Sequence, residues 1–201
     1  MSSSLVAENL TFAYPHCENV IEGFCLEVRD DERVAISAPS GHGKTTLCQL
    51  LAGYLEPSSG TVCVDGEPAV ARSSKPNPVQ LIWQHPEQAM DPYLRIAASL
   101  AEAGDIEPEL IEGLAIDRKW LSRFPHELSG GELQRCCIAR TLALRPKFIV
   151  ADEISTMLDA VTQAQIWKFL LAYFDKHEIG LVFVTHSESL RERIATRTLY
   201  L

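Results

Sequence analysis

Hydrophobic and polar positions change their spacing along the chain, and each change predicts a different element. Residues 5–14 and 24–28 alternate between apolar and polar side chains, so two antiparallel strands are expected to open the domain. Residues 181–184 are continuously apolar, as central parallel strands buried on both faces tend to be. Further strands are expected at residues 34–37, 61–64, 79–83, 148–151 and 198–201.

Helical spacing appears between these strands. Helices are expected at residues 44–52, 132–144 and 187–194, and Gly53 is expected to end the first. A four-three apolar repeat predicts a longer amphipathic helix that covers the sheet and stops at Gly180; its members are Ala160, Ala164, Trp167, Leu171 and Phe174. Between residues 85 and 131, prolines punctuate short helical patterns at residues 94–103 and 108–113. We therefore expect one α/β domain over residues 1–201, with a core at 1–84 and 132–201 and a helical subdomain at 85–131.

Composition and charge narrow the classes of partner. The net charge of −9 argues against nucleic acid as the default partner, because phosphate backbones attract basic surfaces. The six cysteines show no C-x-x-C spacing, so we expect reduced thiols, with Cys136 and Cys137 facing the core. No apolar run approaches 18 residues, so a role at a membrane is expected to depend on a partner.

A stretch of small and polar residues joins the apolar run at 34–36 to the helix expected at 44–52. A loop of this kind lets backbone N–H groups cradle phosphate oxygens, and the following helix adds its positive end. Lys44 would reach the β- and γ-phosphates, and Thr45 would offer its hydroxyl to Mg²⁺. The candidate nucleotide-binding residues are Ser40, Gly41, His42, Gly43, Lys44, Thr45 and Thr46. The plain alternative is an ordinary glycine-containing turn, and Ala38 stands where G-x-x-x-x-G-K-[ST] has its first glycine.

Two carboxylates follow the apolar run at 148–151. Asp152 and Glu153 would lie at the carboxyl end of a buried strand, where ligands bind in open α/β sheets. Alone, the pair also fits a strand that ends in a solvated turn. Downstream of a phosphate loop, Asp152 can hold Mg²⁺ through water while Glu153 polarises the attacking water. The sequence therefore predicts nucleotide hydrolysis.

Residues 128–132, Leu-Ser-Gly-Gly-Glu, have two interpretations. Ser129 and Glu132 form a capping box before an apolar helix. A capped helix start with two glycines is also an anion site that a ligand can approach closely.

With these three stretches in this order, the chain resembles ABC-type ATPases. The resemblance implies a P-loop NTPase core with N-terminal antiparallel strands, a mixed sheet flanked by helices, and a short helical subdomain. Residues 129–131 match the family's signature motif. Tyr14 matches the aromatic residue that stacks on adenine, and His186 matches the switch histidine that contacts the γ-phosphate. Gln84 matches the glutamine that senses Mg²⁺ and the γ-phosphate, and Asp159 the loop that crosses the dimer interface. Taken singly, Tyr14 could be a core aromatic, Gln84 a polar residue at a strand end, and His186 a residue at a helix start.

The resemblance also implies an assembly. Two nucleotide-binding domains, in a homo- or heterodimer, would enclose ATP between the loop of one and the signature of the other. The implied catalytic residues are Lys44, Gln84, Glu153 and His186; the implied Mg²⁺ ligands are Thr45, Gln84 and Asp152; the implied signature residues are Ser129, Gly130, Gly131 and Glu132. The partners of this chain would be transmembrane permease subunits. Through them, the chain would be held on the cytoplasmic side of the cell membrane.

Residues 84–92 and 124–135 resemble the subfamily that powers peptide and nickel import. Met90, Tyr93 and Leu94 lie where family members receive a transmembrane partner, although they could simply pack the subdomain. Two alternatives remain, a soluble ATPase that serves a cytosolic complex and a regulatory ATP-binding module. The chain departs from the family at Ala38, where a left-handed backbone would cost on the order of 1 kcal/mol. It departs again at Glu132, where an added negative charge is expected to slow hydrolysis.

Overall fold

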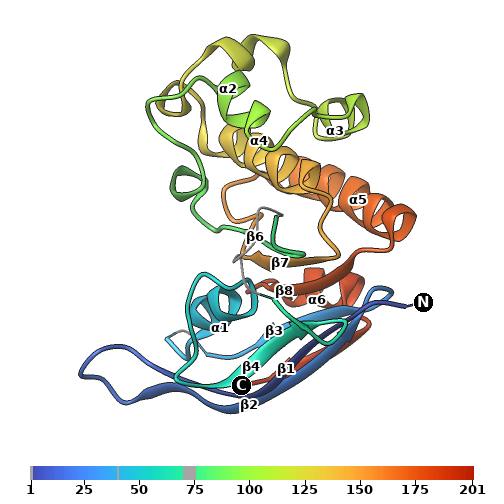
Figure 1. Ribbon diagram of the computed structural model, residues 1–201. Helices are drawn as coiled ribbons and strands as arrows, with labels where there is room; N and C mark the ends of the chain where they lie inside the picture. Colours follow the sequence, from blue (N-terminus) through green and yellow to red (C-terminus); the bar gives the residue numbers. More distant parts are fainter. Residues whose placement is uncertain (1, 40, 70–75) are drawn as a thin grey trace. The chain divides into compact units, whose positions relative to one another are not determined.

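The computed structural model describes residues 2–39, 41–69 and 76–201 (Figure 1). Its strands are β1 (Ser4–Ala13), β2 (Asn19–Arg29), β3 (Arg33–Ser37), β4 (Ser59–Val64), β5 (Glu67–Pro68), β6 (Val79–Ile82), β7 (Phe148–Asp152), β8 (Gly180–Val184) and β9 (Arg197–Tyr200). Its α-helices are α1 (Lys44–Leu51), α2 (Ile96–Ala101), α3 (Pro108–Gly113), α4 (Gly130–Ala143), α5 (Ala160–His177) and α6 (Glu188–Ile194). Short 3₁₀ turns lie at Pro86–Gln88, Arg118–Ser122 and Pro125–Glu127. The expected elements are confirmed, with ends that shift by a few residues.

The chain divides into two compact units. The first comprises Met1–Leu81, Pro146–Asp152 and Glu178–Leu201, and the second comprises Ile82–Arg145 and Glu153–His177. The second unit therefore groups α4 and α5 with the helices of the expected subdomain. The domain boundaries taken from the sequence stay a prediction.

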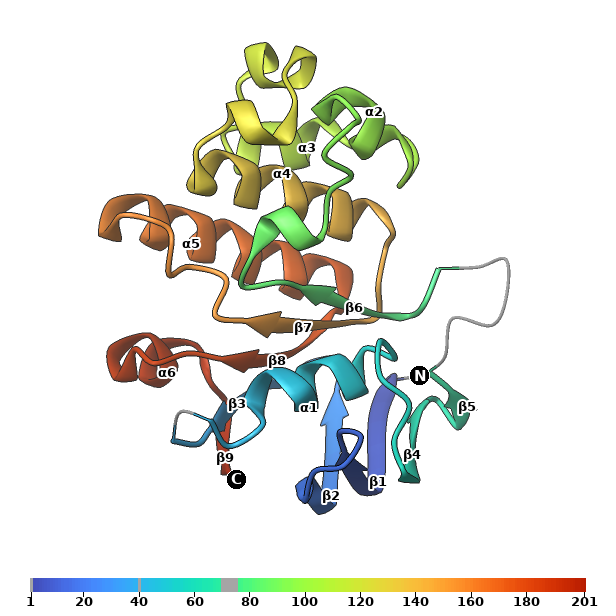
Figure 2. The same ribbon diagram turned by 90° about the vertical axis from the view of Figure 1, so that its left-hand side faces the viewer.

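Two sheets organise the strands. An antiparallel sheet has the order β2-β1-β4-β5, and a second sheet has the order β6-β7-β8-β3-β9, in which β7 with β8 and β3 with both β8 and β9 pair in parallel. Every residue of β7 and β8 is buried, as the continuous apolar run at 181–184 predicted. Helix α1 contacts β2 of the antiparallel sheet and β7 of the parallel sheet (Figure 2). The helix after the phosphate loop is thus held between two sheets.

The buried face of α5 differs from the expected one. Trp167 and Phe174 are buried as predicted, but Ala160 and Ala164 are exposed and Leu171 is only half-buried. The buried residues of this helix are Ile166, Trp167, Leu170, Tyr173 and Phe174. Small alanines contribute little apolar area, so the larger side chains decide which face is covered.

Gly180 has a different role from the predicted helix stop. Helix α5 already ends at His177, and Glu178 has a left-handed backbone (φ 53°). Gly180 is instead the first residue of β8, where a Cβ atom would lie 2.5 Å from the Phe148 ring. Close packing between neighbouring strands therefore requires the glycine.

The adjacent cysteines face the core as expected. Cys136 and Cys137 are buried on α4. Burial raises the pKa of the Cys136 thiol to about 12 and also raises the pKa of Cys137. Both thiols therefore stay protonated near neutral pH and act as small apolar side chains.

Gly60 in β4 gives a stability prediction. Its φ is +89°, and a Cβ atom there would lie 2.4 Å from the carbonyl oxygens of Glu8 and Asn9 in β1. We expect Gly60→Ala to lower the free energy of unfolding by about 3 kcal/mol, from the left-handed backbone and from the clash. Urea unfolding measures the change. Gly66→Ala is the matched control, because φ is +81° but nothing lies within 4 Å, and it should lose only about 1 kcal/mol. Equal losses would contradict the clash.

Candidate functional site

The phosphate loop connects β3 to α1 in the first unit. Gly43 caps the helix with a left-handed backbone (φ 77°), and a Cβ atom there would lie 2.7 Å from Val20 Cγ1. Gly41 is also left-handed (φ 82°), with open space where a Cβ would be. Ser40 lies outside the described residues. These two glycines let the chain turn tightly into the helix N-terminus, which is the backbone arrangement that cradles phosphate.

Lys44 is the first residue of α1 and is 9% exposed. Its ammonium donates hydrogen bonds to the carbonyl oxygens of Ala38 (2.9 Å) and Pro39 (3.0 Å). The charge therefore lies over the loop, where an anion would bind. Ala38 is not among the described non-glycine residues with a positive φ, so the strain considered for this departure from the motif is absent.

The two threonines after Lys44 face different surroundings. Thr45 is exposed, whereas Thr46 is buried and its hydroxyl lies 3.1 Å from the hydroxyl of Tyr14. Tyr14 also packs edge-on against Phe12, with ring centroids 5.0 Å apart, and is 41% exposed. The first helical turn thus anchors the tyrosine ring and leaves the Thr45 hydroxyl accessible. Adenine stacking on Tyr14 stays a prediction.

Asp152 and His186 lie at the carboxyl ends of neighbouring parallel strands. Asp152 is the last residue of β7, pairs in register with Val184 of β8 and is 3% exposed. His186 follows β8 by two residues and is exposed. Parallel strands in register bring their carboxyl ends to one edge of the sheet, so this edge carries the carboxylate and the imidazole.

Glu153 and Gln84 are brought together in the second unit. The amide nitrogen of Gln84 donates to the Glu153 carboxylate across 3.1 Å, although the two residues are 69 positions apart. Glu153 has a left-handed backbone (φ 48°), which is strained for a residue with a side chain. Backbone strain of this kind clusters at functional sites, and six other described non-glycine residues of this chain also have a positive φ. With its nitrogen donating to Glu153, the Gln84 side chain has its amide oxygen as its remaining polar atom, which can only accept.

The capping box at the start of α4 is confirmed. The Ser129 hydroxyl accepts from the Glu132 backbone N–H (3.3 Å), and the Glu132 carboxylate accepts from the Ser129 N–H (2.7 Å). That second hydrogen bond lowers the pKa of Glu132. Ser129 and Gly130 are exposed, so the capped helix start is open to a ligand.

The glycines of this motif also have a packing role that sequence reasoning missed. A Cβ atom on Gly130 would lie 2.9 Å from Met157 Sδ, and one on Gly131 would lie 3.0 Å from Leu158 Cδ2. The segment just before Asp159 therefore packs against the helix start of the same chain. Nothing in the sequence indicates which side chains approach these glycines.

Asp159 caps α5. Its carboxylate accepts from the backbone N–H groups of Val161 and Thr162, each at 3.0 Å, and from the Thr162 hydroxyl at 2.6 Å. These hydrogen bonds, chiefly that from the Thr162 hydroxyl, lower the pKa of Asp159. Its expected place at a dimer interface stays a prediction.

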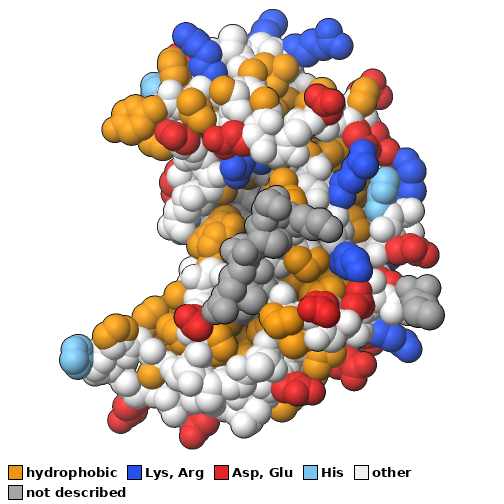
Figure 3. Space-filling view, in the orientation of Figure 1, with side chains coloured by type: hydrophobic (Ala, Val, Ile, Leu, Met, Phe, Trp, Pro, Cys, Tyr) orange, Lys and Arg blue, Asp and Glu red, His pale blue; other side chains and the backbone are white. Residues whose placement is uncertain are grey.

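The residues near the expected permease contact differ in exposure. Met90 is buried and Leu94 is half-buried, so both pack within the second unit. Tyr93 is 87% exposed. Hydrophobic side chains, in orange, stand out from the surface of this unit in Figure 3. Of the three residues, only Tyr93 has a fully exposed side chain.

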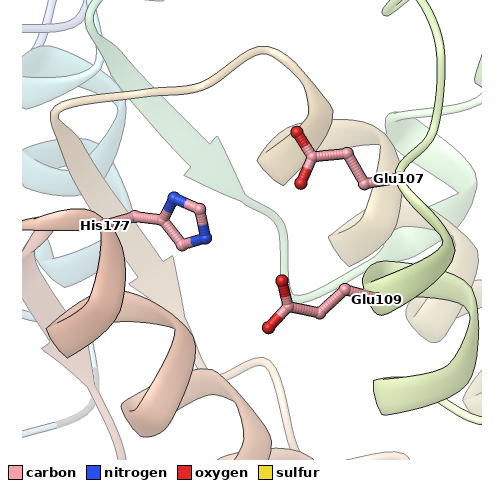
Figure 4. A group of neighbouring side chains, drawn as sticks. All are labelled: Glu107, Glu109 and His177. Atoms are coloured by element: carbon pink, nitrogen blue, oxygen red, sulfur yellow. The ribbon is translucent and has the colours of Figure 1, made fainter.

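Two glutamates and a histidine form the one cluster of three possible metal ligands among the described residues (Figure 4). Ligand atoms of Glu107, Glu109 and His177 lie within 4.8 Å of one another. Glu107 is already paired with Arg145 (2.9 Å), and Glu109 with Lys176 (2.6 Å). These cations satisfy the carboxylates, so we interpret the group as an ion-pair cluster that links α3 to the end of α5.

A buried strand, a glycine-rich loop and a helix that begins with lysine define this chain as a P-loop nucleotide-binding protein. The chain belongs to the ABC transporter family, because the family model described as "ABC transporter" matches residues 21–156. This confirms the resemblance and the fold class predicted from the sequence.

Two curated relatives illustrate the similarity. A putative peptide import ATP-binding protein of Brucella abortus (strain 2308) is 33% identical over 195 residues, which cover 88% of this chain and 58% of the relative. The nickel import ATP-binding protein NikE of Escherichia coli O6:K15:H31 is 32% identical over 197 residues, which cover 90% of this chain and 74% of NikE. The chain thus spans little more than half the length of the peptide import relative.

A solved structure has the same fold. The post-hydrolysis dimer of the ATP-binding cassette MJ0796, bound to ADP and Pi, superposes with a TM-score of 0.84 at 24% identity and covers 98% of this chain and 94% of its own. At this identity the similarity demonstrates the fold alone. Within the described residues, no helix combines the length and apolarity needed to cross a bilayer.

Proposed function

We propose that this chain binds and hydrolyses ATP as the energy-supplying subunit of an ABC importer. The observation that carries the proposal is Glu153, which directly follows β7, has a left-handed backbone and accepts a hydrogen bond from Gln84. A carboxylate held in this way suits a residue that orients and polarises the attacking water. Lys44, on the phosphate loop, offsets the charge that develops on the γ-phosphate.

The ATP site draws on residues of the first unit. Backbone N–H groups of the loop around Ser40, Gly41, His42 and Gly43 bind phosphate oxygens, as does the start of α1 at Lys44, Thr45 and Thr46. Tyr14 stacks on the adenine ring, and its hydrogen bond to Thr46 supports this role by holding the ring beside the helix. His186 contacts the γ-phosphate from the end of β8.

The residues proposed for Mg²⁺ fit a hard cation. Thr45 supplies a hydroxyl, Asp152 a carboxylate and Gln84 an amide oxygen, and Mg²⁺ prefers oxygen ligands of this kind. The exposure of Thr45 supports this assignment. When bound, the ion neutralises charge on the β- and γ-phosphates.

A second nucleotide-binding domain completes the site. The exposed helix start at Ser129, Gly130 and Gly131 supplies donors to ATP held by the partner, and Asp159 lies at the interface. Glu132 adds negative charge near that nucleotide and slows hydrolysis. Mixing two inactive variants of this chain tests whether the second domain is a copy of it.

The importer role rests on the relatives. The peptide and nickel import proteins are named for import, and the exposed Tyr93 offers an aromatic contact to a transmembrane permease subunit. The chain would then act on the cytoplasmic side of the cell membrane, with a peptide, nickel or a similar small solute as cargo.

Copurification tests this function. We expect the tagged chain, isolated from detergent-solubilised membranes of its own cells, to bring down a protein with several transmembrane helices and to hydrolyse ATP only with Mg²⁺. Hydrolysis without a membrane partner would indicate a soluble ATPase instead. ATP binding with negligible hydrolysis, even with the partner present, would indicate a regulatory module. A Lys44→Ala variant is the control for contaminating ATPases.

A further inference from the structure

Helix α4 holds the segment around Gln84 by a regular series of hydrogen bonds. Gln134 donates to the Trp83 carbonyl (3.2 Å), Cys137 to the Pro86 carbonyl (3.4 Å) and Arg140 to the Ala89 carbonyl (3.1 Å). In each pair the donor lies 51 positions after the acceptor. We call these three contacts the α4 ladder.

The even spacing of the ladder has a geometric cause. Side chains three positions apart on an α-helix lie on one face. The segment that accepts the bonds contains the 3₁₀ turn Pro86–Gln88, whose first residue is the middle acceptor, while Trp83 lies before the turn and Ala89 after it. One side of α4 therefore holds this segment at three points.

Gln134 is the member of the ladder next to Gln84. It is 1% exposed, and its amide oxygen has no hydrogen-bond partner among the described residues. A buried amide with only part of its capacity satisfied is costly, and an apolar side chain would pack α4 at less cost. The hydrogen bond to the Trp83 carbonyl is thus the specific contribution of this side chain.

The Trp83 carbonyl belongs to the peptide unit that leads directly into Gln84. Holding that carbonyl fixes the orientation of the peptide, and with it the direction of the Gln84 side chain. The Gln84 amide in turn holds Glu153 at 3.1 Å. The helix that begins with Ser129 and Gly130 is therefore connected to Glu153 through two hydrogen bonds within one unit.

We propose that Gln134 is a positioning residue for hydrolysis, which orients Gln84 and, through it, Glu153. The proposal rests on the proposed ATPase function and deepens it. Movement of α4 at the signature end would change the placement of the water-orienting carboxylate in the same chain.

Gln134→Met tests the proposal, because methionine has nearly the same length but donates no hydrogen bond. We expect kcat to fall about tenfold or more, since small displacements of catalytic groups are costly. The KM for ATP should stay within about twofold, because the loop and Tyr14 are untouched. In a double-mutant cycle with Gln84→Ala, Gln134→Met should cause no further fall in kcat. A merely structural role would instead make the two losses of kcat add.

Cys137→Ala is the matched control. It removes the next contact of the ladder, on the same helix face, but at Pro86 and not beside Gln84. We expect kcat within about twofold of the wild type and a comparable thermal midpoint for both variants. An equal loss of kcat in the two variants would overturn the assignment to Gln134, as would additive losses in the cycle.

A second readout does not depend on hydrolysis. In the nucleotide-free protein, Gln134→Met should speed hydrogen exchange at the backbone amides of residues 83–85, 87 and 88 more than Cys137→Ala does. If the wild-type chain failed to hydrolyse ATP, the proposed function would fail, and this exchange would still show whether Gln134 holds the segment that leads into Gln84. Unchanged exchange at these residues would overturn the inference.

Discussion

A Glu153→Gln variant is expected to bind ATP and to hydrolyse it at least about a hundredfold more slowly than the wild type, the usual scale for loss of a catalytic acid or base. Glutamine has the same shape and its oxygen can still accept the hydrogen bond from Gln84. It lacks the negative charge that polarises water. Because substrate binding is kept and turnover is lost, the ATP-bound dimer should accumulate.

Two measurements check this expectation. Phosphate release gives the turnover rate, and light scattering with Mg²⁺ and ATP gives the fraction of dimer. Glu112→Gln is a matched control, since it makes the same change at an exposed glutamate of α3 in the same unit. Full activity of Glu153→Gln would reject the proposed role of this carboxylate.

Mixing two inactive variants is expected to restore activity if the site is shared between copies of this chain. Lys44→Ala damages the loop side of a site, and Ser129→Arg blocks the signature side. Each variant alone would form dimers with two damaged sites. A mixed dimer has one doubly damaged site and one intact site, so an equal mixture should recover about a quarter of the wild-type rate.

Titration of one variant against the other measures this recovery. The rate should be highest near equal concentrations and should stay at background for either variant alone. Mixing Lys44→Ala with Glu153→Gln is the control, because both changes affect the loop side and no mixed dimer contains an intact site. If the mixture of Lys44→Ala and Ser129→Arg stays at the background rate while the wild type is active, two copies of this chain do not share the site.

Local patterns in the sequence predicted much of the fold and the order of the candidate site's motifs along the chain. The apolar run at 34–37, the small residues after it and Lys44 indicate a strand, a tight turn and a helix start, because turn chemistry and periodicity are local properties. The buried run at 148–151 likewise placed Asp152 at the end of a strand. Ser129 and Glu132 predicted the capping box that the structure contains.

Other features depend on contacts between distant residues, and these could not be predicted. The buried face of α5 and the place of Gly180 follow from side chains contributed by other elements. The backbone of Ala38 is not left-handed. The sequence could not decide this, because the motif usually has a glycine at this position and glycine adopts either conformation.

The sequence by itself determined that this chain has an ABC-type phosphate loop, an acidic strand end and a capped signature helix, because each depends on neighbours in the chain. Only the tertiary structure decided that Gln84 holds Glu153, that Met157 packs against Gly130, and that Gln134 bonds the peptide before Gln84. These partners are 69, 27 and 51 positions apart. At such separations the packing of helices and strands, and not local propensity, brings side chains together.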